Sequence, residues 1–216
     1  MSRAFVQCRE PINSYTHFCG AIASGAGLLL LIARALSVHA DAALLGGAMV
    51  FAVALILLYT ASCVYHFSNM GQAVVARLQR VDHSMIYLLI AGSYTPFAIR
   101  FMPAEVCRTF LLLLWGCAVL GVIVKNCWMA MPRWLGTGIY LALGWAALAE
   151  WKYFTAMPRG CFVLVLLGGV LYSIGGVIYA AKKPNLSPRW GSHELFHLFI
   201  LAASAAHFSA VFFYVL

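Results

Sequence analysis

The feature that most constrains this chain is a series of apolar stretches, each long enough to cross a lipid bilayer. A hydrocarbon core of ~30 Å needs about 20 helical residues, with a range of roughly 17–25. Cutting the sequence at its charged residues gives seven such stretches, at about 12–36, 42–67, 81–100, 106–125, 133–150, 159–181 and 192–215. Because the loops between them are short, we expect an all-α membrane protein with a single seven-helix transmembrane domain over residues 1–216.

The composition excludes an ordinary soluble domain. Hydrophobic residues make up 64% of the chain and charged residues only 9%, whereas soluble domains average roughly half and a quarter. The opening segment MSRAFVQCREPINSYTH is too polar for the apolar core of a signal peptide, so we expect none. The seven cysteines are odd in number and lie mostly within apolar runs, which is typical of packing residues and not of a disulfide framework.

Lysine and arginine are divided unevenly between the two ends of the predicted helices. The N-terminal side carries nine of them: Arg3, Arg9, Arg77, Arg80, Lys125, Arg133, Lys182, Lys183 and Arg189. The other side carries five: Arg34, Arg100, Arg108, Lys152 and Arg159. The positive-inside rule then predicts a cytoplasmic N-terminus and an external or periplasmic C-terminus. We therefore interpret the net charge of +8 as topology, with basic loops at lipid headgroups and no nucleic-acid partner.

Three basic residues flank the two shortest stretches. Lys125 and Arg133 bound the loop between the fourth and fifth stretches, and Lys152 follows the fifth. Long basic side chains at such positions reach from a short helix to the headgroups. We therefore expect all three to lie at the membrane surface.

Ionisable residues inside the predicted helices gather at one depth. Such residues are costly in a membrane and are functional candidates. Six of them lie at the cytoplasmic ends of four helices: His17, His66, Asp82, His83, His193 and His197. The orientation was predicted from lysine and arginine alone. That these six residues lie at one depth is therefore an independent observation.

The spacing of three histidines predicts a metal site. His193 and His197 are four residues apart, so they project from one helix face about 6 Å apart, as two ligands of one zinc do. With His66 they give three imidazoles and leave a fourth tetrahedral position open, which is typical of a catalytic zinc. Asp82 is placed to accept a hydrogen bond from a water there, and Ser62 to bond to Asp82 or to an imidazole.

Each polar residue also has a plainer interpretation. His17 and His83, taken singly, are typical of interfacial or hydrogen-bonded histidines. Asp82 could cap the third helix with its carboxylate at the positive helix end. His207 lies ~15 Å further along the last helix, so we expect an interhelical hydrogen bond there. His39 falls in an outer loop and is expected to be solvated.

The segment SHELFHLF at 192–199 also fits the H-E-x-x-H pattern of zinc proteases. Glu194 points roughly 100° away from His193 on the helix. A protease prediction depends on this glutamate alone, so we interpret the pattern as meaningful in its two histidines only.

Four segments together resemble the hemolysin III and progestin/adipoQ receptor family, in its bacterial branch. They are EPINSYTH (10–17), SCVYH (62–66), VDHSMIYLLIAGSYTPF (81–97) and SHELFHLFILAASAAHF (192–208). They cover four of the seven predicted helices in the family's order. The resemblance implies a multi-pass protein of the bacterial inner membrane. The chain lacks the large N-terminal domain of the eukaryotic receptors, so hormone binding is not expected.

The resemblance also implies roles for particular residues. Zinc would be held by His66, His193 and His197 near the cytoplasmic face, with Asp82 and Ser62 beside the metal-bound water. The opening motif would form a network that ties the first helix to the site, through Glu10, Asn13, Thr16 and His17. His83 occupies a position at which the eukaryotic receptors of the family have a different residue.

These expectations lead to a functional hypothesis with several rivals. Resemblance to ceramidases within the wider superfamily implies zinc-dependent hydrolysis of a lipid amide or ester, with membrane lipids as substrate or ligand. A non-enzymatic sensor or transporter with a structural zinc, linked to membrane homeostasis, is the alternative. A cytolysin would need a soluble form and an export signal, and the sequence shows neither. The sequence leaves the lipid and the oligomeric state open.

Overall fold

The structure, a computed structural model, describes residues 8–216; residues 1–7, which include Arg3 of the charge count, lie outside the described residues. Within residues 8–216 the regular secondary structure is helical, apart from one isolated bridge between Ser187 and Trp190. The elements are α2 (Pro11–Ser37), α3 (Ala42–Phe67), α4 (Gln72–Phe101), α5 (Ala104–Cys127), α6 (Arg133–Gly144), η1 (Ala146–Glu150), α7 (Trp151–Thr155), α8 (Arg159–Ala181), α9 (Ser192–Ala210) and the π-helical η2 (Val211–Val215).

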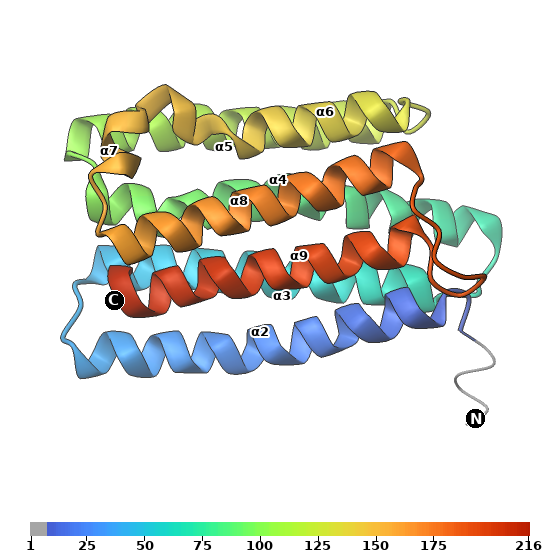
Figure 1. Ribbon diagram of the computed structural model, residues 1–216, viewed down its shortest axis with the longest axis horizontal. Helices are drawn as coiled ribbons and strands as arrows, with labels where there is room; N and C mark the ends of the chain where they lie inside the picture. The colour runs from blue at the N-terminus through green and yellow to red at the C-terminus, as the bar shows by residue number, and fades with distance from the viewer. Residues whose placement is uncertain (1–7) are drawn as a thin grey trace.

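The long helices run side by side in a bundle, joined by short connections (Figure 1). Five are long and apolar enough to cross a membrane: α2, α3, α5, α8 and α9 with η2. Helix α4 and the segment α6–η1–α7 lie alongside these five and complete the predicted seven-helix bundle (Figure 1). The chain is thus a multi-pass integral membrane protein, as predicted. Its orientation, with the N-terminus in the cytoplasm, stays a prediction.

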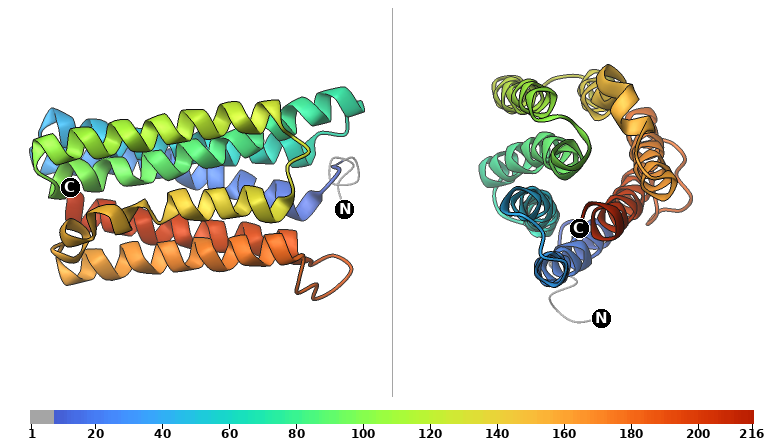
Figure 2. Two further views of the ribbon diagram at one scale, coloured as in Figure 1. Left: turned by 90° about the horizontal axis from the view of Figure 1, so that it is seen from above. Right: turned by 90° about the vertical axis from the view of Figure 1, so that its left-hand side faces the viewer.

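Viewed end-on, the first and last helices of the chain are neighbours (Figure 2, right). Helix α9 packs against both α2 and α8, and α2 packs against α3. Small residues permit close approach where helices cross: a Cβ added at Gly20 of α2 would lie 2.9 Å from a ring carbon of Tyr59 in α3. In lipid, such close packing replaces the hydrophobic effect as the force between helices. This arrangement brings the motifs at the two ends of the chain together.

Helix α4 begins at Gln72, earlier than the start near residue 81 that hydropathy predicted. Its first turns contain Arg77 and Arg80, whose charges exclude this segment from an apolar stretch. The segment nevertheless contains no proline or glycine that would break a helix. Asp82 and His83 are therefore interior residues of a long helix. The interpretation of Asp82 as a helix cap is wrong for this reason.

The fifth predicted stretch, 133–150, is not one helix. Helix α6 ends at Gly144, and the chain continues through η1 into α7. The hydroxyl of Tyr94 in α4 supplies hydrogen bonds to backbone groups where the helix is interrupted. It donates to the Gly144 carbonyl (2.6 Å) and accepts from the Ala147 amide (3.1 Å). Non-helical backbone is tolerated at membrane depth only where such partners satisfy it.

Candidate metal centre

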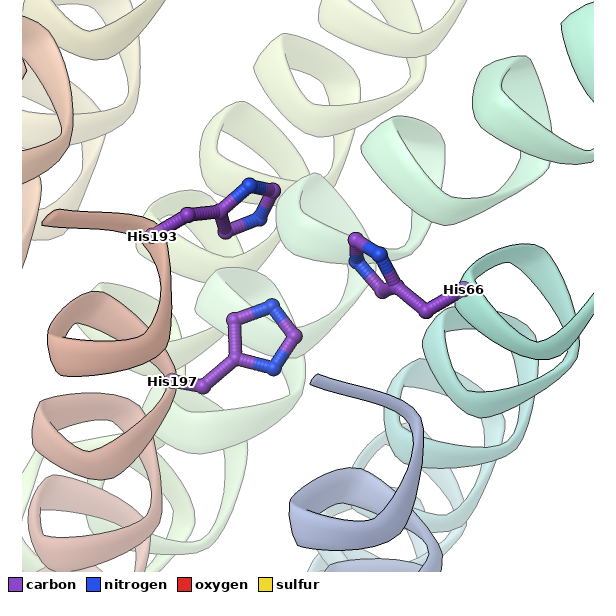
Figure 3. A group of neighbouring side chains, drawn as sticks. All are labelled: His66, His193 and His197. Carbon is purple, nitrogen blue, oxygen red and sulfur yellow. The ribbon is translucent and has the colours of Figure 1, made fainter. Parts of the chain in front are cut away.

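Three histidines from the two ends of the chain meet inside the bundle. His66 comes from the last turn of α3, and His193 and His197 from the first two turns of α9. One ring nitrogen of each lies within 4.8 Å of the others, so the group could hold a metal ion. All three rings point toward a common centre (Figure 3). The four-residue spacing on α9 places two of them on one face, as the sequence predicted.

Glu10 fixes the orientation of His66. The Nδ1 atom of His66 lies 2.7 Å from Glu10 Oε2. Glu10 directly precedes α2. Burial raises the pKa of its carboxyl, but the hydrogen bond and charge of His66, the hydrogen bond of Asn13 and the charge of Arg9 together outweigh burial and lower the pKa to about 2. An ionised carboxylate can only accept, so His66 Nδ1 carries the proton. When this ring is neutral, its lone pair is therefore on Nε2.

The free nitrogen of His66 fits a metal ligand. His66 is 1% exposed, and its Nε2 has no hydrogen-bond partner within residues 8–216. An unpaired buried polar atom costs about 1–3 kcal/mol, which a metal bond would offset. A ligand histidine whose other nitrogen bonds to a carboxylate is the usual arrangement at zinc. Three imidazoles suit zinc or another borderline divalent metal.

A second set of hydrogen bonds ties α2 to α9 beside the cluster. Asn13 Nδ2 donates to Glu10 Oε2 (3.2 Å) and to Glu194 Oε1 (2.8 Å). The other oxygen of Glu194 accepts from the Gly191 amide (2.9 Å), which caps the start of α9. Both oxygens of Glu194 are thus engaged away from the three-histidine centre. This link was not predicted, because a glutamate in the first turn of a helix indicates only the cap.

His17 of α2 lies against the cluster but does not join it. Its ring stacks on that of His197, with centroids 3.6 Å apart and planes 11° from parallel. His17 is not part of the group of three histidines whose ring nitrogens lie within 4.8 Å of one another. Both ring nitrogens of His17 are buried without partners in the described chain. In this rotamer His17 leaves the fourth position of the site open.

Thr16, the remaining member of the predicted opening network, bonds within its own helix. Its hydroxyl donates to the backbone carbonyls of Ile12 (2.9 Å) and Asn13 (3.0 Å). The structure thus brings Glu10, Asn13 and His17 to the cluster, while Thr16 supports the turn that carries them.

Asp82 and Ser62 line a cavity that also reaches two of the three clustered histidines, His193 and His197. The cavity has a volume of about 370 Å³, which lies within the ~300–1,000 Å³ range of small-molecule sites. His193, His197 and His17 line it too, and Ser62 bonds to the Asp82 carboxylate. The predicted pair therefore lines the same cavity as His193 and His197. Their catalytic roles stay predictions.

The cavity continues along the bundle away from the histidines. Its walls there include Phe97 of α4, Phe154 of α7 and Phe162 of α8. Tyr172 also reaches it and bonds to Ser204 (2.8 Å). The site thus joins a polar end to an apolar interior with aromatic and aliphatic walls.

Two of the remaining histidines behave as predicted. His207 bonds through Nε2 to the Val165 carbonyl of α8 (3.1 Å), which is the expected interhelical bond. His39 is exposed in the loop between α2 and α3. His83 lines the cavity with its Nδ1 buried and without a partner in residues 8–216.

Of the three basic residues expected at the membrane surface, Lys125 differs. It is 6% exposed and lines the cavity, so its predicted position at the headgroups is wrong. Arg133 and Lys152 are exposed as expected.

Comparison with known proteins agrees with the motifs. The Haemolysin-III related family matches residues 5–208. The chain is 34% identical to Hemolysin-3 homolog of Bacillus subtilis (strain 168) over 206 residues, covering 95% of this chain and 93% of that protein. It is 36% identical to Hemolysin-3 of Bacillus cereus over 210 residues, covering 96% and 92%. Adiponectin receptor protein of Drosophila melanogaster is more distant, 25% identical over 230 residues, covering 94% of this chain and 50% of the receptor.

Proposed function

This chain belongs to the Haemolysin-III related family, and from that premise we propose that it is a zinc-dependent membrane hydrolase that cleaves an amide or ester bond of a lipid. The observation that carries the proposal is a cluster of three histidines, two of which, His193 and His197, line the same cavity as Asp82 and Ser62. Three protein ligands with an open position are typical of catalytic zinc, whereas structural sites are closed by four.

The residues divide into those that hold the metal and those that act on the substrate. His66, His193 and His197 would bind zinc, which when present polarises a carbonyl and lowers the pKa of a bound water toward ~7. The Asp82 carboxylate would take the proton from the attacking water as general base. Ser62, bonded to Asp82, would hold that carboxylate in position.

The walls of the cavity suit the rest of a lipid. Beyond the polar end, Phe97, Phe154 and Phe162 line the cavity. An acyl chain lying along them would leave water and bring its carbonyl carbon to the histidine end. The short loops could not form a separate substrate domain, so the lipid would enter from the bilayer between helices.

The main rival is a sensor or transporter with a structural zinc. Such a zinc would need a fourth protein ligand, and the stacked ring of His17 lies out of position to supply one. A transport path would need ionisable groups through the whole membrane depth. His207, the deep histidine that lines the cavity, is instead bonded to a backbone carbonyl.

A combined measurement of metal content and hydrolysis tests the proposal. Purified protein should carry about one zinc per chain, and the double variant His193→Ala/His197→Ala none. Wild type should release fatty acid from a panel of lipid amides and esters. Asp82→Ala should abolish release, by a factor of about 10² or more, while keeping most of its zinc.

The control is Glu105→Ala, which removes a carboxylate from an exposed ion pair with Arg108. It should change neither zinc content nor hydrolysis. Zinc-loaded wild type that hydrolyses nothing across the panel would end the enzymatic proposal. Complete zinc loss in Asp82→Ala would make Asp82 a ligand and overturn the role given to it.

A further inference from the structure

A buried lysine with no acidic partner lies at the histidine end of the cavity. Lys125, in the last turn of α5, is 6% exposed and lines the cavity. Within residues 8–216 no carboxylate lies within 4.0 Å of its ammonium group. Burying a charge is costly unless it is paired. A buried lysine without a counter-charge therefore indicates a missing anion.

The charged groups that face Lys125 are also basic. Arg133, at the first residue of α6, lines the cavity, and its guanidinium lies 5.1 Å from the centre of the Tyr179 ring. His83 interacts electrostatically with both Lys125 and Arg133. Asp82, an acidic residue that also lines the cavity, interacts instead with Ser62 and His66. This mouth of the cavity therefore holds an excess of positive charge.

Neutral donors supplement these cations. The hydroxyl of Thr137, which lines the cavity in the first turns of α6, is 6% exposed and has no partner in the described chain. His83 Nδ1 is also buried without one. No side chain caps the N-terminus of α6, and a free helix N-terminus favours an anion. Donors from α4, α5 and α6 thus line the same cavity.

We propose that this cluster, formed by His83, Lys125, Arg133 and Thr137, binds the phosphate of a glycerophospholipid whose acyl chains occupy the apolar length of the cavity. Several donors from three helices match a phosphate, with its several acceptor oxygens and up to two charges, better than a carboxylate. The aromatic walls that follow the polar end favour a lipid over a soluble phosphate.

The inference rests on the proposed function and narrows its substrate. His83 also interacts electrostatically with His193, so the phosphate cluster and the metal ligands are neighbours. In a glycerophospholipid only the glycerol backbone separates the phosphate from the acyl ester carbonyl. A phosphate on the cluster would place that ester beside Asp82 and the three histidines. The favoured reaction is hydrolysis of a phospholipid acyl ester.

Binding can be measured apart from turnover, on the full chain in detergent, by native mass spectrometry with phosphatidic acid and with diacylglycerol of the same acyl chains. Wild type should bind phosphatidic acid more tightly. Lys125→Met should weaken phosphatidic acid binding about 10-fold or more and leave diacylglycerol binding unchanged. Lys125→Arg should retain binding, as should Lys183→Met, which removes an exposed lysine outside the cavity lining.

Three results would overturn the proposal. The first is equal phosphatidic acid binding by wild type and Lys125→Met, and the second is equal binding of the two lipids by wild type. The third is displacement of phosphatidic acid by glycerol 3-phosphate at matching concentration, which would show a site for soluble phosphates. If Lys125→Met gives little folded protein, Arg133→Gln at an exposed position makes the same test.

These outcomes separate the site from the proposed function. Lysine-dependent binding without any hydrolysis would leave the phosphate site standing and end the enzymatic proposal. Hydrolysis by wild type together with unchanged phosphatidic acid binding in Lys125→Met would support the enzymatic proposal and overturn the phosphate site.

Discussion

Two histidines on α9, His197 and His207, are both buried but belong to different regions of the bundle. His197 is 1% exposed and its Nδ1 has no hydrogen-bond partner in the described chain, while its ring faces two other imidazoles. His207 is 9% exposed and bonds through Nε2 to the Val165 carbonyl. Neither burial nor residue type separates a metal ligand from a packing residue. Nδ1 of each ring lacks a hydrogen-bond partner in the described chain; the difference is that Nε2 of His207 bonds to a carbonyl, whereas the ring of His197 lies among other imidazoles.

The sharpest test of this comparison replaces each histidine in turn. His197→Ala should reduce zinc from about one per chain to near none, because two imidazoles hold zinc poorly. His207→Ala should keep the zinc and lower stability by about 1–3 kcal/mol, through the lost bond and the space left beside Gly168. Metal analysis and thermal unfolding in detergent measure both effects. Zinc loss in His207→Ala would remove the distinction between the two regions.

A smaller effect on zinc binding is expected when Glu10, the hydrogen-bond partner of His66, is replaced. Glu10→Gln should lower zinc affinity about 10–100-fold, because a neutral amide orients and polarises the imidazole less than a carboxylate does. Competition with a zinc chelator measures the change. The matched control Glu105→Gln alters an exposed carboxylate at the other end of the bundle. Unchanged affinity in Glu10→Gln would mean that packing alone positions His66.

The smallest effect is expected at Glu194. Glu194→Gln keeps an oxygen that can accept from Asn13 or Gly191 but loses the charge, so stability should fall by about 0.5–2 kcal/mol. Zinc content and any hydrolysis should stay near wild type, as thermal unfolding and metal analysis would show. A loss of activity as severe as that of His197→Ala would revive the protease prediction.

The sequence predicted most of the bundle and the cluster of three histidines, since helix lengths and the four-residue interval on α9 depend on regular spacing. Apolar runs of bilayer length identify helices, and the four-residue interval on α9 places His193 and His197 on one face. What it missed depends on contacts between distant segments. The end of α6 is satisfied by Tyr94 of another helix, and Glu194 is linked to Asn13 across the whole chain.

The position of Lys125 also depends on contacts between distant segments, so it could not be predicted from the sequence around it. A lysine at the end of a short apolar helix normally reaches the headgroups. Whether it turns inward depends on a cavity formed by α4, α6, α8 and α9, none of which its own sequence neighbourhood reveals. The start of α4 was missed for a simpler reason, because hydropathy marks the membrane boundary and not the helix boundary.

The pairing of α3 with α9 also sets an order of events during biosynthesis. His66 is inserted early, whereas His193 and His197 emerge from the ribosome only with the last helix. Until that helix enters the membrane, Glu10 and His66 have no complete site to support. The three-histidine cluster can therefore assemble only after the final insertion step, and a chain truncated before α9 would retain most of its helices without the complete cluster.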